Sequence, residues 1–280
     1  MERKMFTNSL SCLIGIFLML PGICLAADTI TINGSGSALD MMKPMIAAYQ
    51  KNNKTVRITI EKPLGSSGAI KALFGGALDM VLSSRPLKPE EESRGARQQI
   101  YGKTPLVIIV EKNVPAKNIT TKELEDIYTG KSTTWPNGEI IRVVLRPNED
   151  IDTKILSSLS PGMGNAIKAA KSRPGMIAAV TDPEAYTTVS KVSGGLGATG
   201  LPSIITEKLP VTSLTLNGIE ASPQTLASGA YPLAKEIIIV TSPKTPPAAK
   251  KLISFMLSAP GRAIAGKSGV LVTTGATVLK

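Results

Sequence analysis

The sequence of 280 residues contains no histidine and only two cysteines, Cys12 and Cys24. Both cysteines lie within the first 26 residues, so the rest of the chain has no thiol for a disulfide, a metal site or a nucleophile. The lack of histidine removes the commonest general base and the commonest transition-metal ligand. Serine–histidine and cysteine–histidine catalysis are therefore excluded, and we expect neither a metal site nor a cofactor.

Aromatic residues make up only 4% of the chain, whereas 32 basic residues outnumber 21 acidic ones and give a net charge of +11. A basic balance favours acidic partners such as small anions, nucleic acid or anionic lipid surfaces. The lysines are scattered along the chain, and few aromatic rings are available to stack on bases. We therefore expect no nucleic-acid partner. Basicity raises the local concentration of small anions without identifying one.

Long hydrophobic runs are also missing, because the apolar stretch Leu13–Leu20 is shorter than the ~20 residues of a membrane span. Arg3 and Lys4 precede this stretch, and Cys24-Leu25-Ala26 follows it with small residues at the cleavage positions. This pattern predicts a secretory signal peptide over residues 1–26; a retained N-terminal anchor is the alternative. Cleavage leaves an exported chain of about 254 residues, enough for one large domain or two smaller ones.

Strand and helix patterns alternate over the first part of this exported chain. Apolar residues alternate with polar ones in Val56–Glu61, and Leu39, Met42, Ile46 and Tyr49 have helical spacing. Pro44 is expected to interrupt that helix, so that its regular part begins there. Alternating strands and helices predict an α/β fold with a largely parallel, covered sheet. The expected strands of this part are Thr29–Asn33, Val56–Glu61, Met80–Ser83 and Pro105–Val110.

Two Gly/Ser segments, Gly34-Ser35-Gly36-Ser37 and Gly65-Ser66-Ser67-Gly68, each follow an expected strand and open into a helical pattern. Such loops direct free backbone N–H groups and hydroxyls at one point, beside the positive end of a helix. A single loop of this kind is most often a tight turn. Two of them, about thirty residues apart in β–α–β–α order, predict one shared site for a small anion.

A third segment, Gly261–Ser268, fits the phosphate-loop pattern G-x-x-x-x-G-K-[ST]. That loop requires a buried strand before its first glycine and a helix after its serine. Here an amphipathic helical pattern precedes the glycine and an extended segment follows the serine. We therefore interpret the match as a coincidence inside a C-terminal helix.

The Gly/Ser loops are followed by Ser83-Ser84-Arg85-Pro86-Leu87, then by Ile127-Tyr128-Thr129-Gly130-Lys131 and Trp135, and then by Arg146-Pro147. In this order the chain resembles the phosphate-type periplasmic solute-binding proteins of ABC importers over essentially its whole exported length. The resemblance implies a type II periplasmic binding protein fold: two α/β lobes, each a mixed, mostly parallel sheet flanked by helices, joined by two crossing strands. We expect residues 27–107 plus 234–280 in lobe 1 and 108–233 in lobe 2.

The same resemblance implies an oxyanion held in the cleft between the lobes by loop amides, hydroxyls and one arginine. Arg146 matches the cleft arginine, and a guanidinium can offer a bidentate fork to a tetrahedral anion; a surface salt bridge is the alternative. Together, the loops and the resemblance give the following expected ligand-binding residues: Ser35, Gly36, Ser37, Ala38, Ser66, Ser67, Gly68, Ser84, Arg85, Arg146 and Asp150.

Two positions depart from the family pattern. Where phosphate-specific members carry an aspartate that accepts the proton of hydrogen phosphate, this chain has Ser84 followed by Arg85. Where they continue after the arginine with a Ser-Gly-Thr anion loop, it has the acidic segment 149–153. These carboxylates would repel a dianion unless they are paired with cations. Alternatively, Glu149 and Asp150 face solvent and cap the next helix, with Asp152 a good N-cap. The departures make a deprotonated oxyanion, or an organic ligand with a cationic group, more plausible than hydrogen phosphate.

By resemblance, we expect a monomeric periplasmic binding component that captures phosphate or a related small anion by hinge closure and delivers it to an inner-membrane ABC permease. A sensor or adaptor that reports the ligand to a membrane partner is the main alternative. An enzyme that uses the cleft carboxylates is a weaker one, since no spacing of acidic residues or of Ser and Lys indicates a catalytic pair. We therefore expect binding without catalysis.

Overall fold

The computed structural model describes residues 28–174 and 176–273. The predicted signal peptide, residues 1–26, lies outside the described residues. Within them, no helix combines the length and the apolar character needed to cross a membrane.

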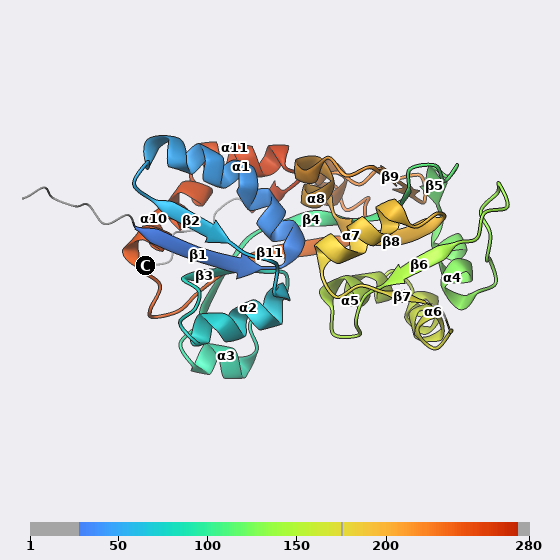
Figure 1. The fold of residues 1–280 in the computed structure, drawn as a ribbon, viewed down its shortest axis with the longest axis horizontal. Helices are drawn as coiled ribbons and strands as arrows, with labels where there is room; N and C mark the ends of the chain where they lie inside the picture. Colours follow the sequence, from blue (N-terminus) through green and yellow to red (C-terminus); the bar gives the residue numbers. More distant parts are fainter. Residues whose placement is uncertain (1–27, 175, 274–280) are drawn as a thin grey trace, which may run out of the picture.

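One long mixed sheet runs through the molecule in the strand order β2-β1-β3-β11-β4-β8-β6-β7 (Figure 1). Neighbours β2, β1 and β3 are parallel, as are β8, β6 and β7, whereas β11 and β4 run antiparallel to their neighbours. The strands of this path are β1 (Thr29–Gly34), β2 (Arg57–Ile60), β3 (Met80–Ser83), β4 (Arg97–Glu111), β6 (Arg142–Leu145), β7 (Ile177–Ala178), β8 (Gly195–Gly200) and β11 (Ala234–Thr241).

The remaining strands are short and lie off this path: β5 (Asn118–Ile119), β9 (Val211–Ser213), β10 (Thr215–Leu216) and β12 (Leu271–Val272). The helices are α1 (Gly36–Asn52), α2 (Gly65–Phe74), α3 (Pro89–Ser93), α4 (Thr121–Thr129), α5 (Ile151–Ser157), α6 (Pro161–Lys171), α7 (Asp182–Lys191), α8 (Leu201–Glu207), α9 (Pro223–Ala227), α10 (Pro247–Leu257) and α11 (Ala259–Lys267).

Strands β4 and β11 join two lobes, as the two-lobed fold requires. The first part of β4 pairs with β11 from Arg97 to Pro105, and its second part pairs with β8 from Leu106 to Val110. Figure 1 shows β1–β3 with α1–α3, α10 and α11 on one side of this crossing, and β6–β8 with α4–α7 on the other. The chain therefore passes between the lobes in the middle of a sheet, where both strands are hydrogen-bonded.

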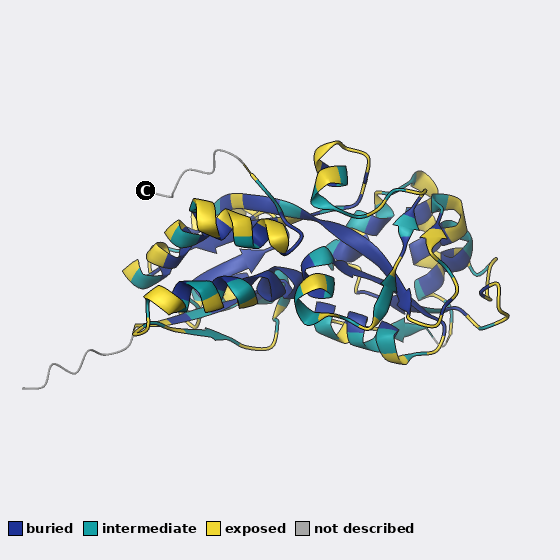
Figure 2. Cartoon of the chain, turned by 90° about the horizontal axis from the view of Figure 1, so that it is seen from above, coloured by how far each residue is buried: buried dark blue, intermediate teal, exposed yellow. Residues whose placement is uncertain are grey.

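Each lobe has apolar cores on both faces of its part of the sheet. Alternate residues of β11 explain this: Ile237 and Ile239 pack with α1 and α10, whereas Ile238 and Val240 pack with α2. In the other lobe Ile108 belongs to the core beneath α4 and α6, and its neighbour Ile109 to the core beneath α7. Figure 2 shows the buried strands between helices whose outer sides are exposed. Side chains of successive strand residues point to opposite faces, so a strand covered on both sides is apolar throughout.

The structure corrects one expectation on this scaffold. Helix α1 begins at Gly36 rather than at Pro44, and Pro44 lies inside it. Proline removes only one helical hydrogen bond, and the buried methionines Met41, Met42 and Met45 hold the helix against the sheet. The interpretation of Gly261–Ser268 is confirmed, because all but its last residue lie within α11.

Candidate functional site

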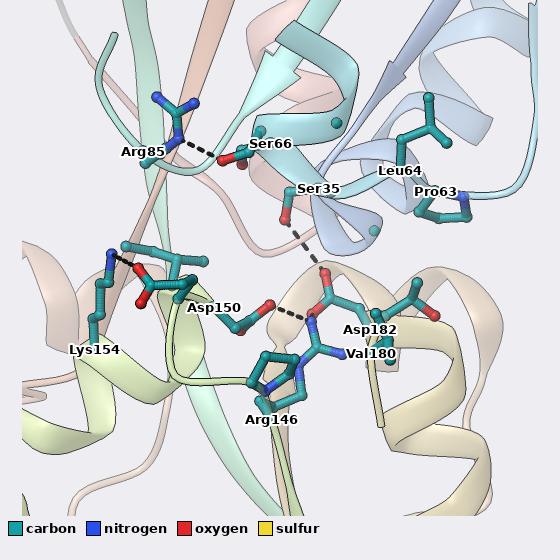
Figure 3. A pocket seen from close by; sticks show the side chains of 18 of the residues that line it. Ser35, Pro63, Leu64, Ser66, Arg85, Arg146, Asp150, Lys154, Val180 and Asp182 are labelled. Carbon is teal, nitrogen blue, oxygen red and sulfur yellow. Dashed lines mark hydrogen bonds and ion pairs between the residues drawn. The ribbon is translucent and has the colours of Figure 1, made fainter. Parts of the chain in front are cut away.

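A cavity of about 270 Å³ opens between the two lobes (Figure 3). Its walls come from the loops and helix starts that follow β1, β2 and β3 on one side, and from those that follow β6 and β7 on the other. Carboxyl ends of parallel strands from both lobes thus face one another, as is usual for ligand sites in α/β sheets. Eight of the eleven expected ligand-binding residues line it: Ser35, Gly36, Ser66, Ser67, Gly68, Arg85, Arg146 and Asp150.

The other three expected residues, Ser37, Ala38 and Ser84, do not line the cavity. All three are buried: Ser37 and Ala38 in the first turn of α1, and Ser84 directly after β3. The Ser84 hydroxyl has no hydrogen-bond partner among the described residues. Buried polar groups are nearly always paired, and the Ser84 hydroxyl is an exception to this rule. Within the described residues its donor and its acceptor are both unused.

The N-terminus of α1 is occupied by a carboxylate from the opposite lobe. The amide of Ser37 donates to Asp182 Oδ2 over 2.9 Å, and the Ser35 hydroxyl donates to the same oxygen over 3.3 Å. Asp182 is the first residue of α7 and is only 3% exposed. The first Gly/Ser loop therefore does form an anion cradle, and a side chain of the protein lies in it.

Within residues 28–174 and 176–273, no carboxylate is bonded to the N-terminus of α2. Its N-cap position, Leu64, makes no side-chain cap, and its first turn contains no acidic residue. Ser66 Oγ accepts a 2.9 Å hydrogen bond from the amide of Ser84, which leaves its hydroxyl hydrogen free to donate. Ser67 Oγ accepts from Arg85 Nε over 3.0 Å. The residues of this second loop, Gly65, Ser66, Ser67 and Gly68, line the cavity at the start of α2.

Arg85 lines the cavity with its guanidinium held by other groups. Its terminal nitrogens donate to the two carboxylate oxygens of Glu91 over 2.7 and 2.8 Å. This pairing, with the Lys88 amide and charge adding to it, lowers the pKa of Glu91 despite its partial burial. A bidentate pair of this kind fixes the plane of the guanidinium. Arg85 therefore forms part of the cavity wall beside Ser67, and its charge is already paired with Glu91.

Arg146 follows β6 and is buried, with 9% of its surface exposed, so it is not a surface salt-bridge residue. Its Nη2 lies 2.6 Å from Asp150 Oδ2 and 3.5 Å from Asp182 Oδ1. Burial alone would lower the Arg146 pKa, but these two carboxylates, with Asp152, raise it. Its Nε has no hydrogen-bond partner in the described part of the chain.

The three acidic residues of segment 149–153 lie in three different environments, and their roles differ in part from the expectation. Glu149 does face solvent, with 92% of its side chain exposed. Asp150, not Asp152, is the N-cap of α5 and accepts from the amide of Asp152 over 2.9 Å. Asp152 is fully buried, and its carboxylate lies 2.7 Å from the ammonium of Lys235. The alternative in which Asp152 caps the helix is thus wrong.

Sequence reasoning missed Asp182 and Lys235 as members of this site. Lys235 Nζ lies 3.1 and 3.3 Å from the two oxygens of Asp182, and it is 1% exposed. A lysine beside the apolar run of β11 was a signal for a buried ion pair, because buried lysines are almost always paired. The partner could not be read from the sequence, since Asp182 is 53 residues away.

Three carboxylates, those of Asp150, Asp152 and Asp182, lie within ion-pair distance of two cations, Arg146 and Lys235. Complete burial raises the pKa of Asp152 to about 8; Lys235 opposes this shift, and the charges of Asp182 and Asp150 add to it. For Asp182 burial acts in the same direction, but the charges of Lys235 and Arg146 outweigh it and lower the pKa below its usual value. Burial therefore disfavours the charged form of Asp152, whereas the two cations favour the charged form of Asp182.

In the described ranges, no group of three or more metal-ligating side chains has a geometry that could hold a metal ion. The chemistry of the cavity is that of amides, hydroxyls, guanidinium and ammonium groups, which bind oxygen-bearing ligands without covalent change. A two-lobed α/β protein with such a cleft is a solute-binding protein in class.

Comparison with known proteins gives the family. The model of the PBP superfamily domain matches residues 25–260, and the chain belongs to this superfamily. It is 27% identical over 255 residues to the phosphate-binding protein PstS of Borreliella burgdorferi, which covers 86% of this chain and 89% of that protein. It is 28% identical over 262 residues to protein SphX of Synechococcus elongatus, which covers 83% of this chain and 74% of that protein.

Solved structures share the fold. A substrate-binding protein of Clostridium perfringens with bound phosphate superimposes with a TM-score of 0.73 at 22% identity, over 88% of this chain and 100% of that one. An ABC-type phosphate transport receptor of Vibrio cholerae does so with a TM-score of 0.60 at 20% identity, over 87% and 100%. The fold is thus that of a type II periplasmic binding protein.

Proposed function

We propose that this chain is the substrate-binding component of an ABC importer and that it binds phosphate or a related small oxyanion in the cleft between its lobes. The observation that carries the proposal is the convergence of both Gly/Ser loops and Arg146 on one cavity. The relatives named above as phosphate-binding proteins support the choice of ligand. Binding and release, rather than catalysis, agree with membership of a solute-binding family.

In this proposal the amides of α2, the Ser66 hydroxyl and Arg146 supply the hydrogen bonds to the anion. The hydroxyl hydrogen that Ser66 keeps after accepting from Ser84, and the Nε of Arg146, which has no partner among the residues described, support these assignments. The guanidinium and the helix N-terminus stand on opposite walls, so an anion between them is bound only when the lobes are close together. Ligand binding would then shift the protein towards its closed form.

We propose that lobe 1 comprises residues 27–107 with 234–280 and that lobe 2 comprises 108–233. The division of the apolar cores supports these bounds to within two residues, because the core of the second lobe begins at Leu106 and its last fully buried member is Leu233. Hinge motion would then bend β4 and β11 close to Pro105 and Ala234, the last pair of their shared register.

Binding proteins of phosphate importers act outside the cytoplasm, and we propose that this one acts in the periplasm after removal of residues 1–26. We further propose that it acts as a monomer and delivers its ligand to an inner-membrane permease. The resemblance to the binding proteins of ABC importers, together with membership of the PBP superfamily, supports a permease partner.

The test is a thermal-shift and calorimetric panel on the purified exported chain with phosphate, sulfate, molybdate, tungstate, phosphonates and small carboxylates. A ligand at 100 times its Kd stabilises the folded state by about 2.7 kcal/mol, a shift in Tm of several degrees. We expect at least one oxyanion to give such a shift and a 1:1 calorimetric isotherm. If no anion of the panel binds, the proposed function is wrong.

A further inference from the structure

The carboxylate of Asp182 has the surroundings expected of a bound oxyanion (Figure 3). It accepts from a helix N-terminal amide and from the Ser35 hydroxyl, and it is paired with the ammonium of Lys235 and the guanidinium of Arg146. These are the kinds of donor that the first Gly/Ser loop and the cleft arginine would offer to a ligand. They come from both lobes and from the start of β11.

The contact leaves no room for a second anion at the same place. A Cβ on Gly36 would lie 2.7 Å from the Cβ of Asp182 and 2.9 Å from its Oδ2. Asp182 therefore rests directly against the first turn of α1, and the close approach depends on a glycine at this position. A ligand oxyanion can reach the amide of Ser37 only after the Asp182 side chain has moved away.

The charges of the cavity lead to the same conclusion. Each cation that lines it has a carboxylate within 4 Å. A phosphate dianion that entered beside Asp182 would meet the carboxylates of Asp150 and Asp182, and every cation that the structure shows in the lining already has a carboxylate partner. If the Asp182 carboxylate leaves, Lys235 and Arg146 lose a partner, and an oxyanion can take its place. These four cations make six ion pairs: Arg85–Glu91, Arg146–Asp150, Arg146–Asp182, Lys154–Glu149, Lys235–Asp152 and Lys235–Asp182.

We propose that the Asp182 carboxylate is an internal substitute for the ligand: it holds the cleft closed at the α1 N-terminus when no ligand is bound, and an incoming oxyanion binds by displacing it. This inference rests on the proposed function, since it assumes that an oxyanion is the ligand of this cleft. The ligand class that can replace a carboxylate here has at least two acceptor oxygens on one centre, which describes carboxylates and tetrahedral oxyanions.

The test compares phosphate binding by the wild type, D182N and D182A in isothermal titration calorimetry at pH 7. We expect D182A to bind phosphate at least tenfold more tightly than the wild type, with D182N between them, because its amide keeps the shape and loses the charge. D126N is the matched control. Asp126 pairs with Lys122 on α4, outside the cavity lining, so its loss should change the phosphate Kd by less than twofold.

A second measurement tests closure by small-angle scattering. We expect the ligand-free wild type to have the radius of gyration of its phosphate-bound form, and ligand-free D182A to be more expanded and to contract when phosphate or acetate is added. Acetate is the probe that replaces the missing side chain. If D182A does not fold, both the calorimetry and the scattering are carried out on D182N.

The outcomes separate this inference from the proposed function. A wild type that binds phosphate, with D182N and D182A no tighter, overturns the inference and leaves the function intact. Phosphate binding by D182A or D182N alone supports the inference and contradicts phosphate as the natural ligand. Absence of phosphate binding in all three proteins overturns both.

Discussion

The amide of Ser37 donates a 2.9 Å hydrogen bond to the carboxylate of Asp182, although 145 positions separate these residues in the sequence. The bond joins the first turn of α1 to the first residue of α7, and both residues are buried. Two helix N-termini therefore meet at the same place, and the carboxylate at the start of α7 accepts from the first turn of α1. Because this contact joins the two lobes at the cleft, it affects both ligand binding and lobe closure.

Replacement of Arg146 by alanine should weaken phosphate binding roughly 10- to 100-fold, because a hydrogen bond to a charged group contributes about 1.5–3 kcal/mol. Calorimetric titration measures the change. Arg142 is the control: it begins β6, the strand that Arg146 follows, and its guanidinium donates to the carbonyl of Ser193 over 2.8 Å instead of lining the cavity. R142A should bind phosphate within about twofold of the wild type. Equal affinities of R146A and the wild type would place Arg146 outside the ligand contacts.

Replacement of Ser66 by alanine should affect both stability and binding. It leaves the buried amide of Ser84 without its acceptor, which should lower the free energy of unfolding by about 1–3 kcal/mol, and it removes a hydroxyl from the cavity. The adjacent S67A is the control, because Arg85 keeps both bonds to Glu91 when the Ser67 hydroxyl is lost. Urea denaturation and phosphate titration of the two variants should therefore differ. Equal stabilities would contradict the role assigned to Ser66.

The pH dependence of stability should report on Asp152. Its pKa rises from 3.8 to about 8 in the folded protein, chiefly because burial disfavours the charged form. Between these two values the folded state holds a proton that the unfolded chain releases. The resulting stabilisation is complete below about pH 4 and is lost as the pH rises through 8.

D152N lacks this proton and provides the comparison. From pH 4.5 to 7.5 the free energy of unfolding of the wild type should fall relative to that of D152N, by up to ~1.4 kcal/mol per pH unit. Urea denaturation at several pH values measures the difference. Parallel curves for the two proteins would mean that Asp152 is ionised throughout.

Gly36 should be intolerant of a methyl group. G36A places a Cβ 2.7 Å from the Cβ of Asp182, so the contact between α1 and α7 must separate and stability should fall. Gly164 in α6 is the control, because its Cβ would only reach an ordinary contact with the Ser157 carbonyl at 3.8 Å. G164A should raise the free energy of unfolding by about 0.5–1 kcal/mol through helix propensity. Thermal unfolding of both variants tests this, and a stable G36A would show that the helix starts are free to separate.

Local patterns gave a large part of the scaffold. The pattern Thr120-Thr121-Lys122-Glu123 is typical of a helix start, and α4 does begin there, with Thr120 accepting from the amide of Glu123; Gly130 ends that helix at a φ of 82°. The predicted strand Met80–Ser83 agrees with β3 in both bounds. Such signals depend only on residues that are neighbours in the sequence, so they can be recognised without the structure.

The strands that local patterns failed to predict are formed by pairing between segments far apart in the sequence. The strand predicted at Pro105–Val110 is the second part of β4, which begins at Arg97, because β11 supplies partners for the polar residues before Pro105. The glycine-rich segment around Gly197 carried no strand pattern, yet it forms β8 between β4 and β6. Glycine is accepted there because neighbouring elements approach closely: a Cβ on Gly197 would lie 2.7 Å from a methyl carbon of Val189.

The sequence by itself determined the class of chemistry: without histidine, and with its cysteines in the first 26 residues, the chain can offer amides, hydroxyls and cations from two Gly/Ser loops and Arg146. Only the tertiary structure decided which anion occupies the α1 N-terminus, because Asp182 and Lys235 reach that place through the packing of separate elements. Composition records how many charges a chain has, whereas the energy of a buried charge depends on which opposite charges lie within a few ångströms of it.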